Sequence, residues 1–199
     1  TSTSSSGGYT TKCGTSMASP TVAGVAALML EQFRLSFPAT ADPRNSTLKA
    51  ILANSAAEIG DSGPDYQSGY GSVRGVPAVE TIIEERFLEA EVAQGETYSF
   101  IILVDPEDTE LKVTLAWDDP PGTPNVDPVL VNDLDLRVID GNSVTHFPWT
   151  LDPATPENPA VRTVADHANN LEQVVIDAPA PGAYRVEVEG FNIAEGATQ

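Results

Sequence analysis

The serine at position 16 is the residue whose setting best suits covalent chemistry. It follows Gly14, which permits a tight backbone turn, and it precedes an apolar segment at residues 22–30. The pattern predicts that Ser16 lies at the start of a helix, where free N–H groups and the helix dipole favour negative charge. Such a serine can attack a carbonyl carbon while nearby N–H groups stabilise the oxyanion. The alternative is structural, because serine is also a preferred helix N-cap.

A cluster of carboxylates in the second half of the chain is the second candidate for chemistry. It consists of Asp118, Asp119, Asp127, Asp133 and Asp135. On a strand, Asp133 and Asp135 would lie on one face, with the leucines between and after them on the other. Ca²⁺ takes six to eight oxygen ligands from carboxylates and carbonyls, so a calcium site with Asp118, Asp133 and Asp135 as ligands is one interpretation. A solvated acidic face is the other.

The aromatic residues of the second half and the single cysteine each have a structural interpretation and a functional one. Trp117 ends an alternating inward series and is expected in the core, whereas Phe147 and Trp149 lie in a long loop; together they could also stack against a sugar. Cys13 is expected to be a small, partly buried residue beside Ser16, with a reactive thiol as the alternative. Because it is the single cysteine, an internal disulfide is impossible.

The periodicity of apolar residues changes near residues 88–96 and predicts two regions. Helices are expected at residues 16–35, 45–56 and 77–87. The helix at 16–35 is expected to be buried on all sides. The helix at 45–56 should be capped by Asn45 or Ser46, and the helix at 77–87 should begin at Pro77. Residues 1–14 are predicted to be loop. Strands are expected at residues 97–104, 111–117, 134–139, 171–176 and 183–190, without intervening helices. We therefore expect domains at 1–91 and 92–199, the second an antiparallel β-sandwich or jelly roll.

Composition narrows the class of partner. The chain has 10 basic and 29 acidic residues in 199, a formal net charge of −19. Such a surface repels phosphate backbones, which argues against a nucleic-acid partner. The longest apolar run is too short to span a bilayer. The first residues carry no signal-peptide pattern and read like the interior of a longer protein, so we expect the chain to be a fragment.

The segment around Ser16 resembles the nucleophile motif of the subtilisin-like serine proteases. The motif is unbroken over Gly14, Thr15, Ser16, Met17, Ala18, Ser19 and Pro20, and it continues in Val22, Ala23 and Gly24. Residues 48–56 and 68–79 are similar to the following segments of that catalytic domain. Residues 113–122, 130–138 and 169–193 resemble the C-terminal jelly-roll domain of alkaline subtilases. The resemblance implies an α/β catalytic part at 1–91, secretion, and calcium binding, which is common in the family.

The resemblance also assigns roles. Ser16 would be the acyl-forming nucleophile of a serine endopeptidase, and the backbone at Thr15 and Ser16 would form part of the oxyanion hole. In this family the triad Asp and His precede the Ser, and the oxyanion-hole Asn lies upstream too. His146 and His167 both follow Ser16, and each is expected to be a surface or packing residue. The predicted partners are therefore a peptide substrate and the missing N-terminal part of the catalytic domain, without which the chain should be inactive. The alternative is a non-catalytic glycan- or protein-binding module with a remnant protease segment.

Overall fold

The helices precede the main strands along the chain, as the change of periodicity predicts. The computed structural model describes residues 1–126 and 129–199. The helices are α1 (Thr15–Ser36), α2 (Asn45–Ser55) and α3 (Gly75–Ile83). The strands are β1 (Ser2–Thr3), β2 (Tyr9–Thr10), β3 (Thr97–Val104), β4 (Glu110–Ala116), β5 (Asn132–Ile139), β6 (Thr145–His146), β7 (Leu171–Asp177) and β8 (Gly182–Ile193). The five predicted strands are confirmed as β3, β4, β5, β7 and β8.

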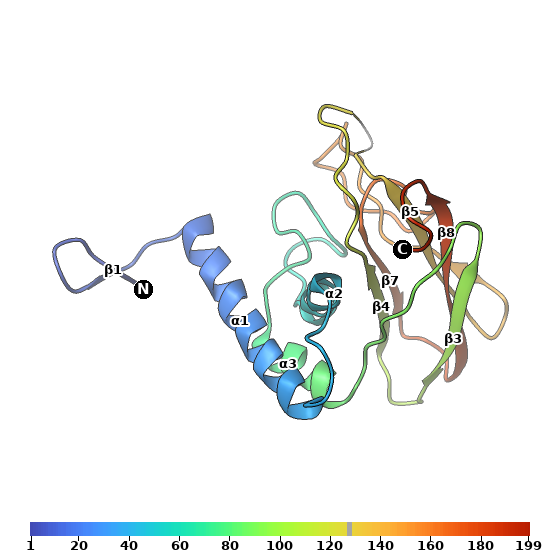
Figure 1. Cartoon of the computed structure of the whole chain (residues 1–199), viewed down its shortest axis with the longest axis horizontal. Helices are drawn as coiled ribbons and strands as arrows, with labels where there is room; N and C mark the ends of the chain where they lie inside the picture. The colour runs from blue at the N-terminus through green and yellow to red at the C-terminus, as the bar shows by residue number, and fades with distance from the viewer. Residues whose placement is uncertain (127–128) are drawn as a thin grey trace.

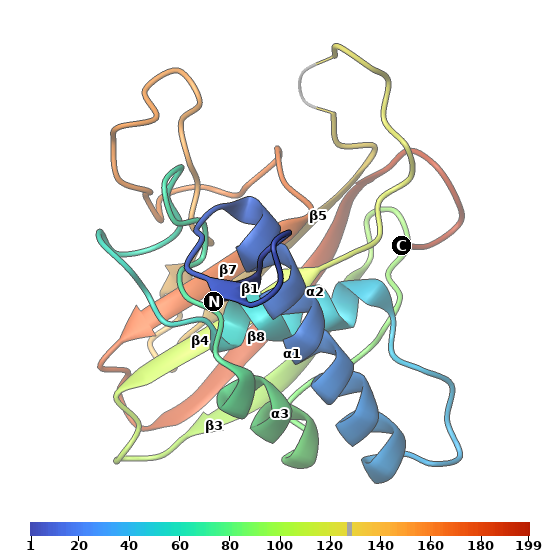
Figure 2. The same cartoon turned by 90° about the vertical axis from the view of Figure 1, so that its left-hand side faces the viewer.

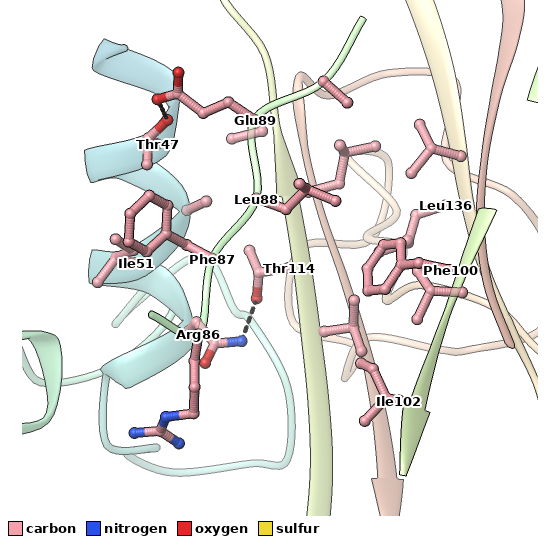
Figure 3. A pocket seen from close by; sticks show the side chains of 18 of the residues that line it. Thr47, Ile51, Arg86, Phe87, Leu88, Glu89, Phe100, Ile102, Thr114 and Leu136 are labelled. Carbon is pink, nitrogen blue, oxygen red and sulfur yellow. Dashed lines mark hydrogen bonds between the residues drawn. The ribbon is translucent and has the colours of Figure 1, made fainter. Parts of the chain in front are cut away.

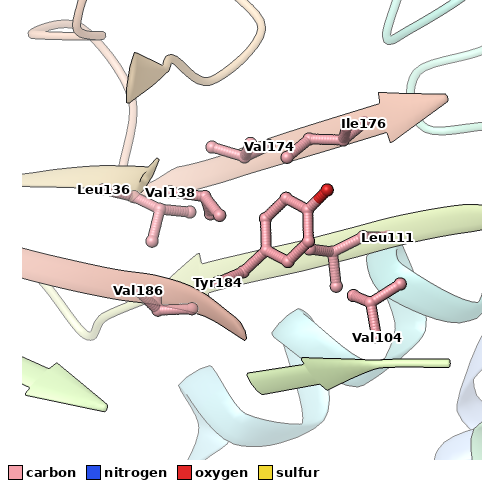
Figure 4. Close-up of a cluster of buried hydrophobic side chains, with 8 residues drawn as sticks. All are labelled: Val104, Leu111, Leu136, Val138, Val174, Ile176, Tyr184 and Val186. Atoms are coloured by element: carbon pink, nitrogen blue, oxygen red, sulfur yellow. The ribbon is translucent and has the colours of Figure 1, made fainter. Parts of the chain in front are cut away.

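Two antiparallel sheets lie face to face in the second half of the chain (Figure 1). One has the strand order β3-β8-β5-β6, and the other pairs β4 with β7. Alternating apolar side chains from both sheets meet between them, as Figure 4 shows, because successive residues of a strand point to opposite faces. The buried set is Val104, Leu111, Leu136, Val138, Val174, Ile176, Tyr184 and Val186. The structure therefore supports a two-sheet β unit.

The three helices form a layer against the β4–β7 sheet. Figure 1 shows α2 beside β4, with α1 and α3 on the far side of α2, and Figure 2 shows α1 crossing in front of α2. A separate apolar cluster joins the helices: Met29, Phe33, Ile51, Ala78 and Ile82. The Asn54 side chain at the end of α2 donates to the Lys112 carbonyl (3.1 Å) and to Thr114 Oγ1 (3.0 Å) on β4. These contacts bring the two regions of the chain into one packed body.

Helix α1 is far more exposed than its composition predicts. Its buried residues are Met29 and Phe33, while Leu28 and Leu35 are 54% and 69% exposed. The expectation of a helix buried on all sides is therefore wrong for the part of the chain that the structure describes. The physical reason is that α2 and α3 cover a single side of α1, so its other apolar residues have nothing described to pack against.

Smaller expectations about element ends also need correction. Residue Arg44 occupies the N-cap position of α2 without a side-chain cap bond among the described residues, so neither Asn45 nor Ser46 caps that helix. Helix α3 begins two residues before Pro77. The segment 1–14, predicted to be loop, contains the short hairpin β1–β2. No helix in residues 1–126 or 129–199 is both long and apolar enough to cross a membrane.

Candidate functional site

Ser16 is the second residue of α1, and the turn at Gly14 sets where this helix begins. Gly14 has φ of 135°, a left-handed conformation that residues with a Cβ rarely adopt. Its carbonyl accepts from the Met17 N–H (2.9 Å) and the Ala18 N–H (3.2 Å), which starts the helix. Gly14 is therefore the N-cap residue, and no side chain in the described residues caps the helix. The interpretation of Ser16 as the N-cap is wrong.

The start of α1 is electrostatically suited to an oxygen that gains negative charge. The N–H groups of Thr15 and Ser16 lie in the first turn, where a helix offers no acceptor four residues earlier. The positive end of the helix dipole lies at the same place. Pro20 lacks the N–H that would bond the Ser16 carbonyl, so that carbonyl is left out of the helical ladder. The exposed hydroxyl of Ser16 is thus set among free backbone groups rather than held in a structural bond.

A general base for Ser16 is absent from the part of the chain that the structure describes. No side chain in residues 1–126 or 129–199 forms a hydrogen bond with the Ser16 hydroxyl. The histidines are engaged in the β unit. His146 Nε2 lies 3.6 Å from Asp140 Oδ2, and His167 Nδ1 lies 2.9 Å from Asp133 Oδ2. A serine nucleophile needs a base within hydrogen-bond reach, so the described residues alone do not form a complete catalytic group.

The other residues of the motif are open to solvent. Ala18, Ser19 and Pro20 are exposed, and Met17 is half-buried. Cys13 is a free, exposed thiol, so the expectation of a partly buried residue is wrong. Cys13 lies just before α1, and the other positions lie in its uncovered first turns, which explains their exposure and that of Val22 (38%).

The aromatic residues do not form an exposed platform. Trp117 is 4% exposed and donates its indole N–H to the Asn132 carbonyl (2.9 Å), which confirms the core prediction. Trp149 is also buried, and the Arg162 guanidinium lies 4.3 Å from the centre of its ring. Because both indoles are buried, the sugar-stacking interpretation that relied on them is wrong.

The structure brings two of the three predicted metal ligands together and leaves Asp118 apart from them. Asp133 and Asp135 lie on β5 with their carboxylates together, and His167 joins them, so that one ligand atom from each lies within 4.8 Å of the others. Asp118 is not part of this group; it raises the pKa of Lys49 by its charge, against the larger lowering that burial causes. Asp119 instead accepts from the Val131 and Asn132 backbone N–H groups. Asp127 lies outside the described residues.

Sequence reasoning missed His167 as a member of this group. The residue lies in a loop 34 positions after Asp133, and nothing in its local pattern indicates where the side chain goes. The one available signal was the polar run Asp166–Asn170 directly before β7, a strand that packs beside β5. A loop that enters a strand next to Asp-Leu-Asp can bring a side chain to those carboxylates.

Burial changes the acid–base properties of the carboxylates around β5 and β7. Burial raises the pKa of Asp133 and of Asp135 above the ordinary value, although the nearby His167 lowers both. Burial also raises the pKa of Glu172 on β7 to about 10, against the lowering effect of the hydrogen bond from the Leu136 N–H. The charges of Asp166, Asp135 and Asp133 raise it further. Glu172 is therefore a neutral carboxylic acid at pH 7.

A cavity of about 840 Å³ lies away from Ser16, and its lining runs from the helical layer past β4 to residues between the two sheets. Figure 3 shows Ile51 and Phe87 on one side and Phe100 and Ile102 on the other, with the Glu89–Thr47 hydrogen bond at its rim. The described residues that line it come from α2, α3, the connection to β3 and the strands, and none comes from α1. The cavity is a largely apolar space between packed layers and does not extend the Ser16 site.

Comparison with known proteins shows what the Ser16 segment is similar to. The model of the subtilase family matches residues 1–71, which include the whole start of α1. The chain is also similar to a protein of Dictyostelium discoideum, the "Serine protease/ABC transporter B family protein tagA", with 31% identity over 172 residues. That alignment takes in 76% of this chain and 9% of the other protein, so the chain spans less than a tenth of this relative. The helical region, residues 1–91, is less than half of the 199 residues. An alignment over 76% of the chain therefore includes part of the β unit as well.

Proposed function

We propose that this chain is the nucleophile-bearing part of a subtilisin-like serine endopeptidase, with Ser16 as the catalytic residue. The observation that carries the proposal is the position of Ser16: exposed, second in α1, behind the left-handed Gly14, and inside the segment that matches the subtilase family. An exposed hydroxyl among uncapped N–H groups suits the attack on a peptide carbonyl. The substrates are peptides or proteins.

The reaction is acyl transfer to the Ser16 hydroxyl. The Ser16 Oγ attacks the carbonyl carbon, its proton passes to a general base, and the oxyanion is stabilised by the backbone N–H of Ser16 with support from Thr15. The base, then acting as an acid, gives the proton to the leaving amine, and water hydrolyses the acyl-enzyme. We propose that the triad Asp and His and the oxyanion-hole Asn belong to polypeptide upstream of Thr1. The isolated chain is then inactive.

The exposed apolar side chains of α1 support the proposal of a missing partner segment. Val22, Leu28 and Leu35 are 38%, 54% and 69% exposed on a helix whose other side packs against α2 and α3. Apolar surface of this kind gains about 25 cal/mol for each Å² that is buried. The remainder of a catalytic domain seated on α1 would bury these residues and bring a base to Ser16.

The second half of the chain belongs to this proposal as a C-terminal β-domain. We propose domains at 1–91 and 92–199, a jelly-roll relationship for the second, and a secreted parent protein. The competing class is a non-catalytic glycan- or protein-binding module with a remnant protease segment. Two observations count against it: the motif around Ser16 is intact, and Trp117 and Trp149 are buried rather than displayed.

Peptide hydrolysis by the parent polypeptide tests the proposal. The parent should cleave a fluorogenic casein substrate, and Ser16→Ala should reduce kcat/KM by about 10³-fold or more. Ser36→Ala, at the other end of α1, is the matched control and should keep full activity. The isolated 199-residue chain should show no turnover. Activity of the parent that survives Ser16→Ala would refute the role of Ser16, and turnover by the isolated chain would refute the claim of a missing base.

A further inference from the structure

We propose that Asp133, Asp135 and His167 form a site for a divalent transition-metal ion of the zinc type. The His167 Nδ1 atom lies 2.9 Å from Asp133 Oδ2 and 3.3 Å from Asp135 Oδ1. In a tetrahedral site with metal–ligand bonds near 2.05 Å, neighbouring ligand atoms lie about 3.3 Å apart. The two separations from the imidazole nitrogen are thus close to the edges of such a tetrahedron, and all three ligand atoms lie within 4.8 Å of one another.

Unpartnered buried oxygens in the same group point to a missing cation. Asp133 and Asp135 are 7% and 8% exposed, and the Oδ1 atom of each is buried without a hydrogen-bond partner among the described residues. The Asp135 Oδ1 atom lies 3.3 Å from His167 Nδ1, but the two atoms do not form a hydrogen bond. Buried carboxylate oxygens normally have partners, because removing them from water is costly. A divalent cation bound by both carboxylates would balance their two negative charges.

The third ligand is held in place from two sides. The His167 ring stacks on Phe191 with ring centres 4.4 Å apart and planes at 25°. Phe191 is available for this contact because the β5–β8 register shifts between Asp133 and Leu134, so that Phe191 has no partner in β5. Asp166 fixes the loop on the other side by accepting from the Ala168 backbone N–H (2.9 Å) and the Asn169 side chain. The imidazole is therefore oriented before a metal arrives.

The donor set favours a transition metal over calcium. Calcium requires six to eight oxygens, whereas this group offers two carboxylates and an imidazole nitrogen. Carboxylate and imidazole ligands suit zinc and its neighbours, and three protein ligands leave one position of a tetrahedron open. The His167 side chain is 46% exposed, which gives an ion a path from solvent.

Zinc titration of the full 199-residue chain, with a chromogenic chelator as competitor, tests the site. We expect one zinc ion to bind per chain, and His167→Gln and Asp135→Asn to weaken that binding at least tenfold. His146→Gln is the matched control, because it removes the other histidine, which also lies beside an aspartate. The control should bind zinc as the natural chain does, and millimolar calcium should not displace the zinc.

Spectroscopy keeps the test decisive if a variant fails to fold by circular dichroism. Cobalt bound to the unmodified chain should give the intense visible absorption of four-coordinate cobalt, and zinc should abolish it. Absence of saturable zinc binding would overturn the proposal. So would unchanged affinity in a folded His167→Gln chain, efficient displacement by calcium, or a weak six-coordinate cobalt spectrum. Each of these results would identify the group as a buried ion cluster in which His167 itself balances the carboxylates.

Discussion

Replacing Glu172 by glutamine should change how the stability of this protein depends on pH. The side chain is fully buried on β7; its Oε2 atom accepts from the Leu136 N–H (2.7 Å), and its Oε1 atom has no partner in the described residues. Burial and the charges of Asp166, Asp135 and Asp133 raise its pKa from 4.5 to about 10. In the unfolded chain the carboxyl loses its proton near pH 4.5, so folding at neutral pH requires proton uptake.

The sign and size of the effect follow from that difference. A group whose folded-state pKa is raised contributes stability that is complete below its unfolded-state pKa and is lost as the pH rises toward the folded-state pKa. Between those two pKa values, each pH unit removes about 1.4 kcal/mol from the free energy of unfolding. From pH 5 to pH 8 the loss approaches about 4 kcal/mol, which is a large part of the stability of an ordinary domain.

Glu172→Gln removes this loss while keeping the shape and the bond from Leu136. The free energy of unfolding, measured by urea titration in EDTA, should be similar for the natural chain and the variant at pH 5. At pH 8 the variant should be more stable by up to about 4 kcal/mol. Asp177→Asn, an exposed carboxylate on the same strand, is the control and should leave the difference between the two pH values unchanged. A Glu172→Gln curve parallel to that of the natural chain would refute the reasoning.

Three other substitutions test the packing. Leu136→Ala should lower the free energy of unfolding by about 2–5 kcal/mol in urea titration, because the side chain is 1% exposed between the sheets; a loss below about 1 kcal/mol would contradict that placement. Gly71→Ala should lower the thermal midpoint, since φ is +100° and a Cβ would lie 2.2 Å from the Ala57 carbonyl oxygen; an unchanged midpoint would rule out this close approach. Asn54→Ala should lower the free energy of unfolding by about 1–2 kcal/mol in the same titration, because it removes the hydrogen bonds to the Lys112 carbonyl and to Thr114 Oγ1 on β4; full stability would mean that the helical layer does not depend on this contact.

The β unit was the easier part to predict because its signals are local. Tyr184 and Val186 are buried while Arg185 between them is exposed, which is the alternation visible in the sequence. The boundaries of β3 and the core position of Trp117 followed from the same alternation. The strand order could not be predicted, because β8 lies between β3 and β5 although it comes last in the chain, and residue patterns do not record long-range pairing.

Features of the candidate sites that depend on residues close in sequence were predicted correctly, and those that depend on distant residues were not. Ser16 was placed correctly at the start of a helix because Gly14 and the residues after it are neighbours in sequence. Helix α1 was wrongly expected to be buried, because composition records which side chains favour burial but not whether anything covers them. His167 was missed because its partners on β5 are distant in sequence.

The measurement that tests the central claim most directly is the mapping of a covalent adduct. A fluorophosphonate probe should label the parent polypeptide, and peptide mass spectrometry should locate the adduct on Ser16, whose hydroxyl is exposed at the start of α1. Heat-denatured parent should not be labelled, because an unfolded chain has neither the base nor the oriented N–H groups. An adduct on another residue, or an active parent in which Ser16 remains unmodified, would contradict the assignment of Ser16 as the nucleophile.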